Sequence, residues 1–251
     1  MRLARVTAHL VRGVATAALL FPFVGRRGQA ALIRSWSAGL LAALAVRVEV
    51  NGGFLRGDAT PLCVVANHVS WLDIFVINAT HPTRFVAKSD VRGWPVIGWL
   101  CERAGTLFVE RHRRRGAARV NRAIAAALER GETVGVFPEG TTSAGNIVLP
   151  FHASLLEPAL VCDAPVYPLA IRYLRGDGSL CHEADYTGDK SITASLLLMA
   201  SQPTIRACLH VLPPIRAGAA SHRKAVAREA AERIAEALGV PATGAAASAT
   251  P

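Results

Sequence analysis

The sequence predicts an α/β fold, with a mixed, mostly parallel sheet flanked by helices and with N-terminal helices at a membrane interface. Short apolar runs of strand type alternate along the chain with longer segments of helical pattern, which is typical of a sheet packed between helices. A length of 251 residues suits one such domain with appended helices. A composition of 51% hydrophobic and only 18% charged residues also indicates membrane contact.

Residues 1–45 are predicted to form two amphipathic or re-entrant helices that dock on a membrane. Basic side chains recur there at helical spacing, namely Arg2, Arg5, His9 and Arg12. The uncharged run that follows contains Pro22, which ends a helix, and a second uncharged run covers residues 35–46. Both runs are shorter than the roughly 20 residues of a spanning helix, and we expect Trp36 at the headgroup level. A signal peptide over residues 1–25 is the alternative, although no small-x-small cleavage site precedes Arg26.

Residues 46–238 form the predicted main domain. Strands are expected where short apolar or β-branched runs are bounded by turn residues, at Val46–Val50, Leu62–Ala66, Arg84–Lys88, Thr106–Glu110, Thr133–Phe137, Val166–Tyr173 and Ile205–Val211. Helices are expected between them, at 70–78, Pro95–Ala104, Ala117–Arg130, His152–Val161 and, capped by Ser221, Ser221–Leu238. The Ala/Ser/Thr/Pro-rich tail Gly239–Pro251 is expected to be disordered.

The net charge of the chain indicates which partners it favours, and its cysteines indicate the redox compartment. A net charge of +10 favours acidic partners such as anionic lipid headgroups, an acidic carrier protein or nucleic acid. Nucleic acid is the weakest of these, since aromatic residues make up 6% of the chain and we find no recognition motif in it. The five cysteines form no CxxC pair and are odd in number, which favours free thiols in a reducing compartment.

The segment Asn67–Asp73 carries the clearest chemistry in the chain. It places His68 and Asp73 five positions apart, just after a predicted buried strand. A neutral imidazole takes a proton near pH 7, and a carboxylate on its other nitrogen fixes the tautomer and stabilises the resulting cation. The pair therefore predicts a general base, which needs no enzyme nucleophile if the substrate brings its own hydroxyl group.

Three more segments are assigned to strand ends, where α/β folds place their sites. They are Gly105–Arg111, the Phe-Pro-Glu-Gly-Thr-Thr-Ser run at 137–143, and Val166–Ala170. In order and spacing, the four segments resemble the motifs of glycerolipid acyltransferases of the lysophosphatidic acid acyltransferase type: His-x4-Asp, Gly-x-x-Phe-x-x-Arg, Phe-Pro-Glu-Gly-Thr-x-Ser and Val-x-Pro. A lone His-x4-Asp is a weak signal, whereas all four in order are a strong one. The resemblance spans about residues 45–215 and includes Lys88, Pro95 and Gly98.

The resemblance implies O-acyl transfer from acyl-CoA or acyl carrier protein to the free hydroxyl of a lysolipid, 1-acyl-sn-glycerol-3-phosphate giving phosphatidic acid. His68 would be the general base and Asp73 its orienting partner. Arg111 would grip the acceptor phosphate. The remaining substrate-site residues would be Lys88, Glu139, Gly140, Thr141 and Pro168. No metal and no cofactor beyond the acyl thioester is expected, and the enzyme would work at the cytoplasmic face of the inner membrane.

Thr142 departs from this pattern, because enzymes acting on lysophosphatidic acid commonly have arginine there. With one cation fewer, the pocket suits a zwitterionic headgroup better, and residues 140–151 look more like the branch that acylates lyso-ornithine lipids. His152 also replaces a common Lys or Arg. Lyso-ornithine lipid is therefore the alternative acceptor.

Two other protein classes would each explain part of this sequence. A non-catalytic membrane-binding protein would account for residues 1–46 but would leave the His–Asp pair without a purpose. A serine hydrolase using Ser70 or Ser143 would need a GxSxG nucleophile elbow, which the sequence lacks.

Overall fold

The computed structural model describes residues 1–53, 61–94, 96–109, 114–216, 218 and 221–243. Its centre is a seven-stranded sheet in the order β1-β7-β6-β2-β5-β3-β4. The strands are β1 (Val46–Asn51), β2 (Leu62–Ala66), β3 (Arg84–Lys88), β4 (Leu107–Val109), β5 (Thr133–Val136), β6 (Val166–Arg175) and β7 (Ile205–Val211). All neighbours pair in parallel except β6 and β7, which are antiparallel, so the predicted mixed, mostly parallel sheet is confirmed.

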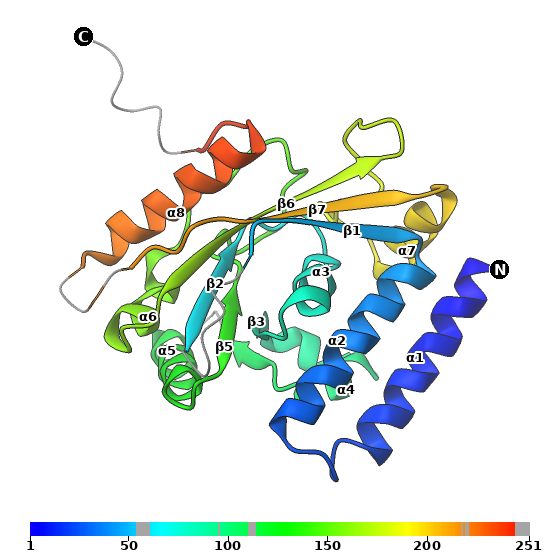
Figure 1. The fold of residues 1–251 in the computed structure, drawn as a ribbon, viewed down its shortest axis with the longest axis horizontal. Helices are drawn as coiled ribbons and strands as arrows, with labels where there is room; N and C mark the ends of the chain where they lie inside the picture. Colours follow the sequence, from blue (N-terminus) through cyan, green and yellow to red (C-terminus); the bar gives the residue numbers. More distant parts are fainter. Residues whose placement is uncertain (54–60, 95, 110–113, 217, 219–220, 244–251) are drawn as a thin grey trace.

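Helices cover both faces of this sheet (Figure 1). One face carries α1 (Arg2–Leu19), α2 (Arg26–Ala43), α3 (Asp73–Thr80), α4 (Ile97–Arg103) and α7 (Ile192–Ser201). The other carries α5 (Arg114–Glu129), α6 (Glu157–Val161) and α8 (Arg223–Leu238). Two 3-10 turns, Ser89–Gly93 and Ala153–Leu155, complete the regular structure of the described residues.

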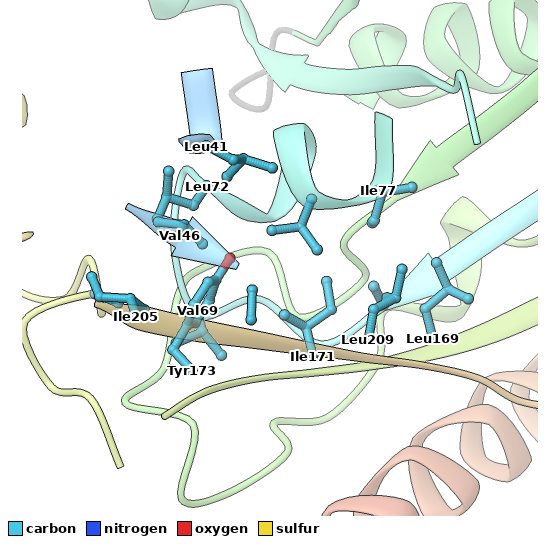
Figure 2. Close-up of a cluster of buried hydrophobic side chains, with 14 of the residues drawn as sticks. Leu41, Val46, Val69, Leu72, Ile77, Leu169, Ile171, Tyr173, Ile205 and Leu209 are labelled. Carbon is cyan, nitrogen blue, oxygen red and sulfur yellow. The ribbon is translucent and has the colours of Figure 1, made fainter. Parts of the chain in front are cut away.

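Strand β2 is buried on both faces, as a short continuous apolar run predicts. Leu62, Val64 and Ala66 face the cluster under α2 and α3, while Cys63 and Val65 face the cluster under α5 and α8. Figure 2 shows the first cluster, in which side chains of α2, α3, β6 and β7 meet. The residues that follow β2 therefore start from one of the most rigid positions in the fold.

The first two helices form a hairpin that is tied internally. His9 Nε2 lies 2.7 Å from the Trp36 carbonyl oxygen, and Trp36 Nε1 donates to the His9 carbonyl oxygen over 3.1 Å. A Cβ atom on Gly13 would lie 2.3 Å from Trp36 Nε1, so only glycine allows this close approach. The basic face predicted for α1 is thus wrong at His9, which is buried. The Trp36 ring packs against His9 and Phe75, and its position at the headgroup level stays a prediction. None of the described helices is both long and apolar enough to cross a bilayer.

Several element boundaries differ from the sequence-based expectation. Helix α2 begins at Arg26, nine residues before the uncharged run at 35–46, because Arg26, Arg27 and Arg34 are charged and so fall outside that run. Helix α7 was not expected; Ser191 caps it by accepting from the Ala194 amide. The last helix starts after His222, so the predicted Ser221 cap is wrong.

Disorder was predicted from Gly239 onward, and this start is too early. The Val148 amide donates to the Pro241 carbonyl and the Thr243 amide to the Val148 carbonyl, so the chain is ordered to residue 243. Residues 244–251 lie outside the described part.

Candidate active site

The candidate site lies at the carboxyl ends of the adjacent parallel strands β2, β5 and β3. Asn67 directly follows β2, is fully buried, and bridges to the neighbouring strand β6. Its Nδ2 donates to the Ile171 carbonyl over 3.0 Å, and its Oδ1 accepts from the Ile171 amide over 2.8 Å. Because both bonds are buried and the β2–β6 ladder ends at Ala66 and Leu169, Asn67 fixes the point from which His68 leaves the sheet.

His68 and Asp73 meet as the sequence predicts. His68 Nδ1 lies 2.8 Å from Asp73 Oδ2, and the same oxygen accepts from the amides of Val69 (2.8 Å) and Ser70 (2.9 Å). Asp73 is the first residue of α3 and is completely buried, whereas the His68 side chain is 21% exposed. Asp73 Oδ2 thus accepts from three donors, and the side chain orients the ring from inside and leaves its outer edge open to a substrate.

This bond decides the histidine tautomer. A carboxylate oxygen only accepts, so His68 Nδ1 carries the hydrogen and donates it. In the neutral ring, Nε2 is then the free base. The pair can take a proton at Nε2 while Asp73 stabilises the cation that forms, which is the arrangement of a general base with an orienting carboxylate.

Aromatic and backbone contacts hold the His68 ring in place. The ring stacks on Phe137 with centroids 4.0 Å apart and planes 13° apart, and Phe137 in turn stacks on Phe85 at 5.5 Å. The Ser143 amide donates to the His68 carbonyl over 2.8 Å. Both Phe137 and Ser143 come from the Phe-Pro-Glu-Gly-Thr-Thr-Ser run, so this segment supports the histidine as well as lining the site.

Glu139 is a buried carboxyl group at the end of β5, only 5% exposed. Neither of its oxygens has a hydrogen-bond partner of normal geometry among the described residues. Burial raises the pKa of Glu139 to about 8, and the Asp73 charge acts in the same direction; the backbone amides of His68 and Leu149 lower it without outweighing burial. Glu139 therefore keeps its proton near neutral pH and has an unused hydrogen-bonding group to offer a ligand.

The turn after Glu139 places the next three residues differently. Gly140 has a φ of 74° and its amide donates to the Phe137 carbonyl, so the chain reverses there. Thr141 is exposed, while the Thr142 hydroxyl donates to the Tyr186 carbonyl. The Tyr186 amide donates to the Val69 carbonyl over 2.9 Å. The loop around Tyr186 is therefore attached to the site by two bonds, one from its amide to Val69 in the His-x4-Asp segment and one to its carbonyl from Thr142.

The remaining residues predicted to bind substrate do not all lie beside His68 in the described structure. Lys88 is exposed at the end of β3, at the same edge of the sheet as His68. Pro168 is buried inside β6 opposite Val65, so the expected place of its segment at a strand end is wrong; the strand continues to Arg175. Arg111 lies outside the described residues. Within the described part of the chain, we find no group of three His, Cys, Asp or Glu side chains able to hold a metal ion.

In the structure, neither of the two serine hydroxyls proposed for a hydrolase mechanism bonds to the His68 ring. Ser70 is fully buried and its hydroxyl has no partner among the residues described, while the Ser143 hydroxyl donates to the Ile147 carbonyl within its own loop. A nucleophile has to contact its base, so this geometry speaks against either serine as a nucleophile.

One residue of this network, Tyr173, is not marked by any sequence motif. The Tyr173 hydroxyl donates to Asp73 Oδ1 over 2.7 Å, and Tyr173 is 2% exposed. It lies 100 positions from Asp73 on β6. Nothing in a strand that reads as buried and apolar marks one tyrosine as the partner of a carboxylate, so only the packing of β6 against β2 reveals it.

Comparisons with known proteins show the family of the chain. Residues 47–172 match the family model described as Acyltransferase. The chain is 39% identical over 210 residues to the lyso-ornithine lipid O-acyltransferase of Pseudomonas aeruginosa, covering 82% of this chain and 78% of that protein. It is 41% identical over 148 residues to the 1-acyl-sn-glycerol-3-phosphate acyltransferase of Neisseria meningitidis serogroup B, covering 59% of this chain and 58% of the relative.

A solved structure also has this fold. The crystal structure of the 1-acyl-sn-glycerophosphate acyltransferase PlsC from Thermotoga maritima superposes with a TM-score of 0.67, covering 95% of this chain and 97% of the other. At 21% sequence identity, this likeness establishes the shared fold.

Proposed function

The chain belongs to the Acyltransferase family, and from that premise we propose that it transfers a fatty acyl group from a thioester to the free hydroxyl of a lysolipid. The single observation that carries the proposal is the buried Asp73 carboxylate, which holds His68 Nδ1 at 2.8 Å and leaves Nε2 as a base at the end of β2. The same two residues occupy the His-x4-Asp positions of the family motif.

The reaction follows from this arrangement. Nε2 of His68 takes the proton of the acceptor hydroxyl as its oxygen attacks the thioester carbonyl carbon. When the tetrahedral intermediate collapses, the carbon–sulfur bond breaks, the thiolate leaves with the electron pair, and the imidazolium returns the proton to the sulfur. Asp73 stabilises the imidazolium between these two steps. Glu139, protonated and without a normal partner among the described residues, is available to donate a hydrogen bond to a substrate oxygen.

The decisive variant is His68→Ala. Loss of the base should reduce kcat by about 10²–10⁴-fold. Thiol release from an acyl thioester, with and without acceptor lipid, measures this, and acyl-CoA and acyl carrier protein run side by side identify the donor. His222→Ala is the matched control, because His222 is exposed in front of α8. Wild-type turnover by folded His68→Ala would contradict the proposal, and thioester turnover without acceptor would favour a hydrolase.

Two acceptors remain in consideration, 1-acyl-sn-glycerol-3-phosphate and lyso-ornithine lipid. The first agrees with the family motifs. Thr142 favours the second, since its hydroxyl bonds to Tyr186 where an arginine would add a cation to the pocket. The P. aeruginosa relative, named for lyso-ornithine lipid, also matches over more of the chain than the Neisseria relative does.

Competition between the two acceptors decides this point. We expect Thr142→Arg to shift selectivity toward the phosphomonoester acceptor. Thr142→Val is the matched control, because it also removes the bond to Tyr186 but adds no charge. If both variants change selectivity equally, the charge at position 142 does not set the acceptor.

We place the enzyme at the cytoplasmic face of the inner membrane, where the acceptor stays in the bilayer and the donor arrives from the cytosol. The support is a group of exposed apolar side chains at the end of α1, where Leu19 is 65%, Leu20 47% and Phe23 86% exposed. Co-sedimentation with vesicles containing phosphatidylglycerol tests it. Phe23→Asp should weaken binding and Phe23→Leu should not; equal binding of both would remove this surface from the proposal.

A further inference from the structure

We propose that the Tyr173 hydroxyl is a positioning group for the reaction, because it holds the far side of the Asp73 carboxylate while the near side orients His68. The inference rests on the proposed function, in which His68 is the general base. No motif of the sequence marks this tyrosine, and it reaches the site only through the packing of β6.

The two oxygens of Asp73 have separate partners. Oδ2 accepts from His68 Nδ1 and from the backbone amides of Val69 and Ser70, all within 2.9 Å. Oδ1 accepts from the Tyr173 hydroxyl over 2.7 Å. Without that hydroxyl, Oδ1 would be a buried charged oxygen with no partner among the described residues, and the plane of the carboxylate would be held from one side only.

The direction of the bond is fixed by chemistry. An ionised carboxylate only accepts, so the phenol donates. Burial, and then the Asp73 charge, raise the pKa of Tyr173 well above its ordinary value, so the phenol stays neutral and keeps its hydrogen. The ionisable groups around Asp73 are His68 after β2, Glu139 after β5 and Tyr173 on β6. Of these, Tyr173 is the neutral donor on the side away from the substrate.

Strand β6 makes Tyr173 a rigid support. It lies between β2 and β7, and the Tyr173 side chain belongs to the buried cluster of that sheet face. Figure 2 shows the ring among Val69, Ile171 and Ile205, with its oxygen directed toward the side of β6 that carries α3. Two residues earlier, Ile171 is bound by Asn67. Strand β6 thus holds the catalytic segment at both ends, next to His68 through Asn67 and at Asp73 through Tyr173.

A merely structural tyrosine would fill space, and this alternative makes a different prediction. Tyr173→Phe keeps the ring and removes only the hydroxyl, so packing is conserved while the Asp73 bond is lost. Ile205→Val on β7 is the matched control, since it removes one buried methylene from the same cluster beside the Tyr173 ring and leaves the Asp73 bonds intact.

The experiment measures kcat and both KM values of the two variants, together with the proton NMR signal of the His68 Nδ1–H, assigned by its loss in His68→Gln. We expect Tyr173→Phe to lower kcat about ten- to thirtyfold, the loss of one hydrogen bond to a charged group, with both KM values unchanged. We also expect the Nδ1–H signal to shift or broaden in Tyr173→Phe. Ile205→Val should keep the wild-type kcat and the wild-type signal.

Two results would overturn the inference: a folded Tyr173→Phe with wild-type kcat and an unmoved signal, or equal losses of kcat in both variants. If Tyr173→Phe does not fold, wild-type chain made with 3-fluorotyrosine keeps the hydroxyl but makes it a stronger donor. The Nδ1–H signal must then move, and an unmoved signal contradicts the inference. His68→Ala separates this inference from the proposed function, because activity in that variant refutes the base, whereas an inactive His68→Ala beside a fully active Tyr173→Phe refutes only the role of Tyr173.

Discussion

Replacing Asp73 with asparagine removes the charge behind His68 while keeping the shape of the side chain. The amide oxygen can occupy the position of Oδ2 and still accept from His68 Nδ1 and from the amides of Val69 and Ser70. The amide nitrogen then faces the Tyr173 hydroxyl, which has to turn from donor to acceptor. One hydrogen bond is reversed and the others persist, so we expect folding to survive with a loss of about 1 kcal/mol in the free energy of unfolding.

Catalysis should suffer much more than stability. The imidazolium formed in the reaction loses the attraction of a buried negative charge. At about 4 Å between charge centres and an effective dielectric constant of about 20, that attraction is about 4 kcal/mol. Each 1.36 kcal/mol of barrier is tenfold in rate, so kcat should fall about 10³-fold.

Steady-state thiol release at saturating donor and acceptor measures this effect. Glu132→Gln is the matched control, because the Glu132 carboxylate is half-buried and bonded to Arg84 and Arg130 but precedes β5, at the opposite edge of the sheet from His68. It should leave kcat near wild type. A folded Asp73→Asn enzyme with kcat within about tenfold of wild type would refute the electrostatic argument, and Asp73 would then serve only to orient the ring.

Three further outcomes follow from the same geometry. Because the pKa of Glu139 is raised from 4.5 to about 8, its contribution to stability is complete below pH 4.5 and is lost as the pH rises toward 8. In thermal melts, the stability of wild type should therefore fall relative to that of Glu139→Gln as the pH rises from 4.5 to about 8. A stability difference that does not change with pH would contradict the raised pKa. Asn67→Ala removes both bonds to the buried Ile171 backbone and should lower the free energy of unfolding, measured in urea, by about 2–4 kcal/mol. Asn78→Ala frees only the Thr83 amide, so it should lower that free energy by about half as much. In Gly135→Ala the new Cβ would lie 2.6 Å from the Phe85 ring, so the stack of Phe85 and Phe137 under His68 should shift. The free energy of unfolding should fall by about 1–3 kcal/mol, and kcat should fall as well. A variant with wild-type stability and wild-type kcat would show that the stack adapts.

The elements most accurately predicted from sequence were those whose signal is local. The apolar runs of β2, β3 and β7 are bounded by turn residues and agree with the structure within a residue. Helix α7 was missed because it is apolar on all sides and shows no amphipathic period. The start of α2 was placed too late because Arg26, Arg27 and Arg34 lie outside the uncharged run. The Val166–Ala170 segment was assigned to a strand end, but Pro168 lies inside β6, although proline is rare in central strands. The strand tolerates it because its ladder with β7 begins at Leu169, one residue later.

The sequence by itself determined the reaction-bearing pair. His68 and Asp73 are five positions apart, close enough for one turn after β2 to join them, so no distant contact is needed to predict their bond. Only the tertiary structure decided what supports that pair. Asn67, Phe85, Glu139 and Tyr173 come from four segments of the chain, and the order of strands β6, β2, β5 and β3 brings them together. The burial that raises the pKa of Glu139 and the bond from Tyr173 to Asp73 are properties of that packing, and no local pattern of residues encodes them.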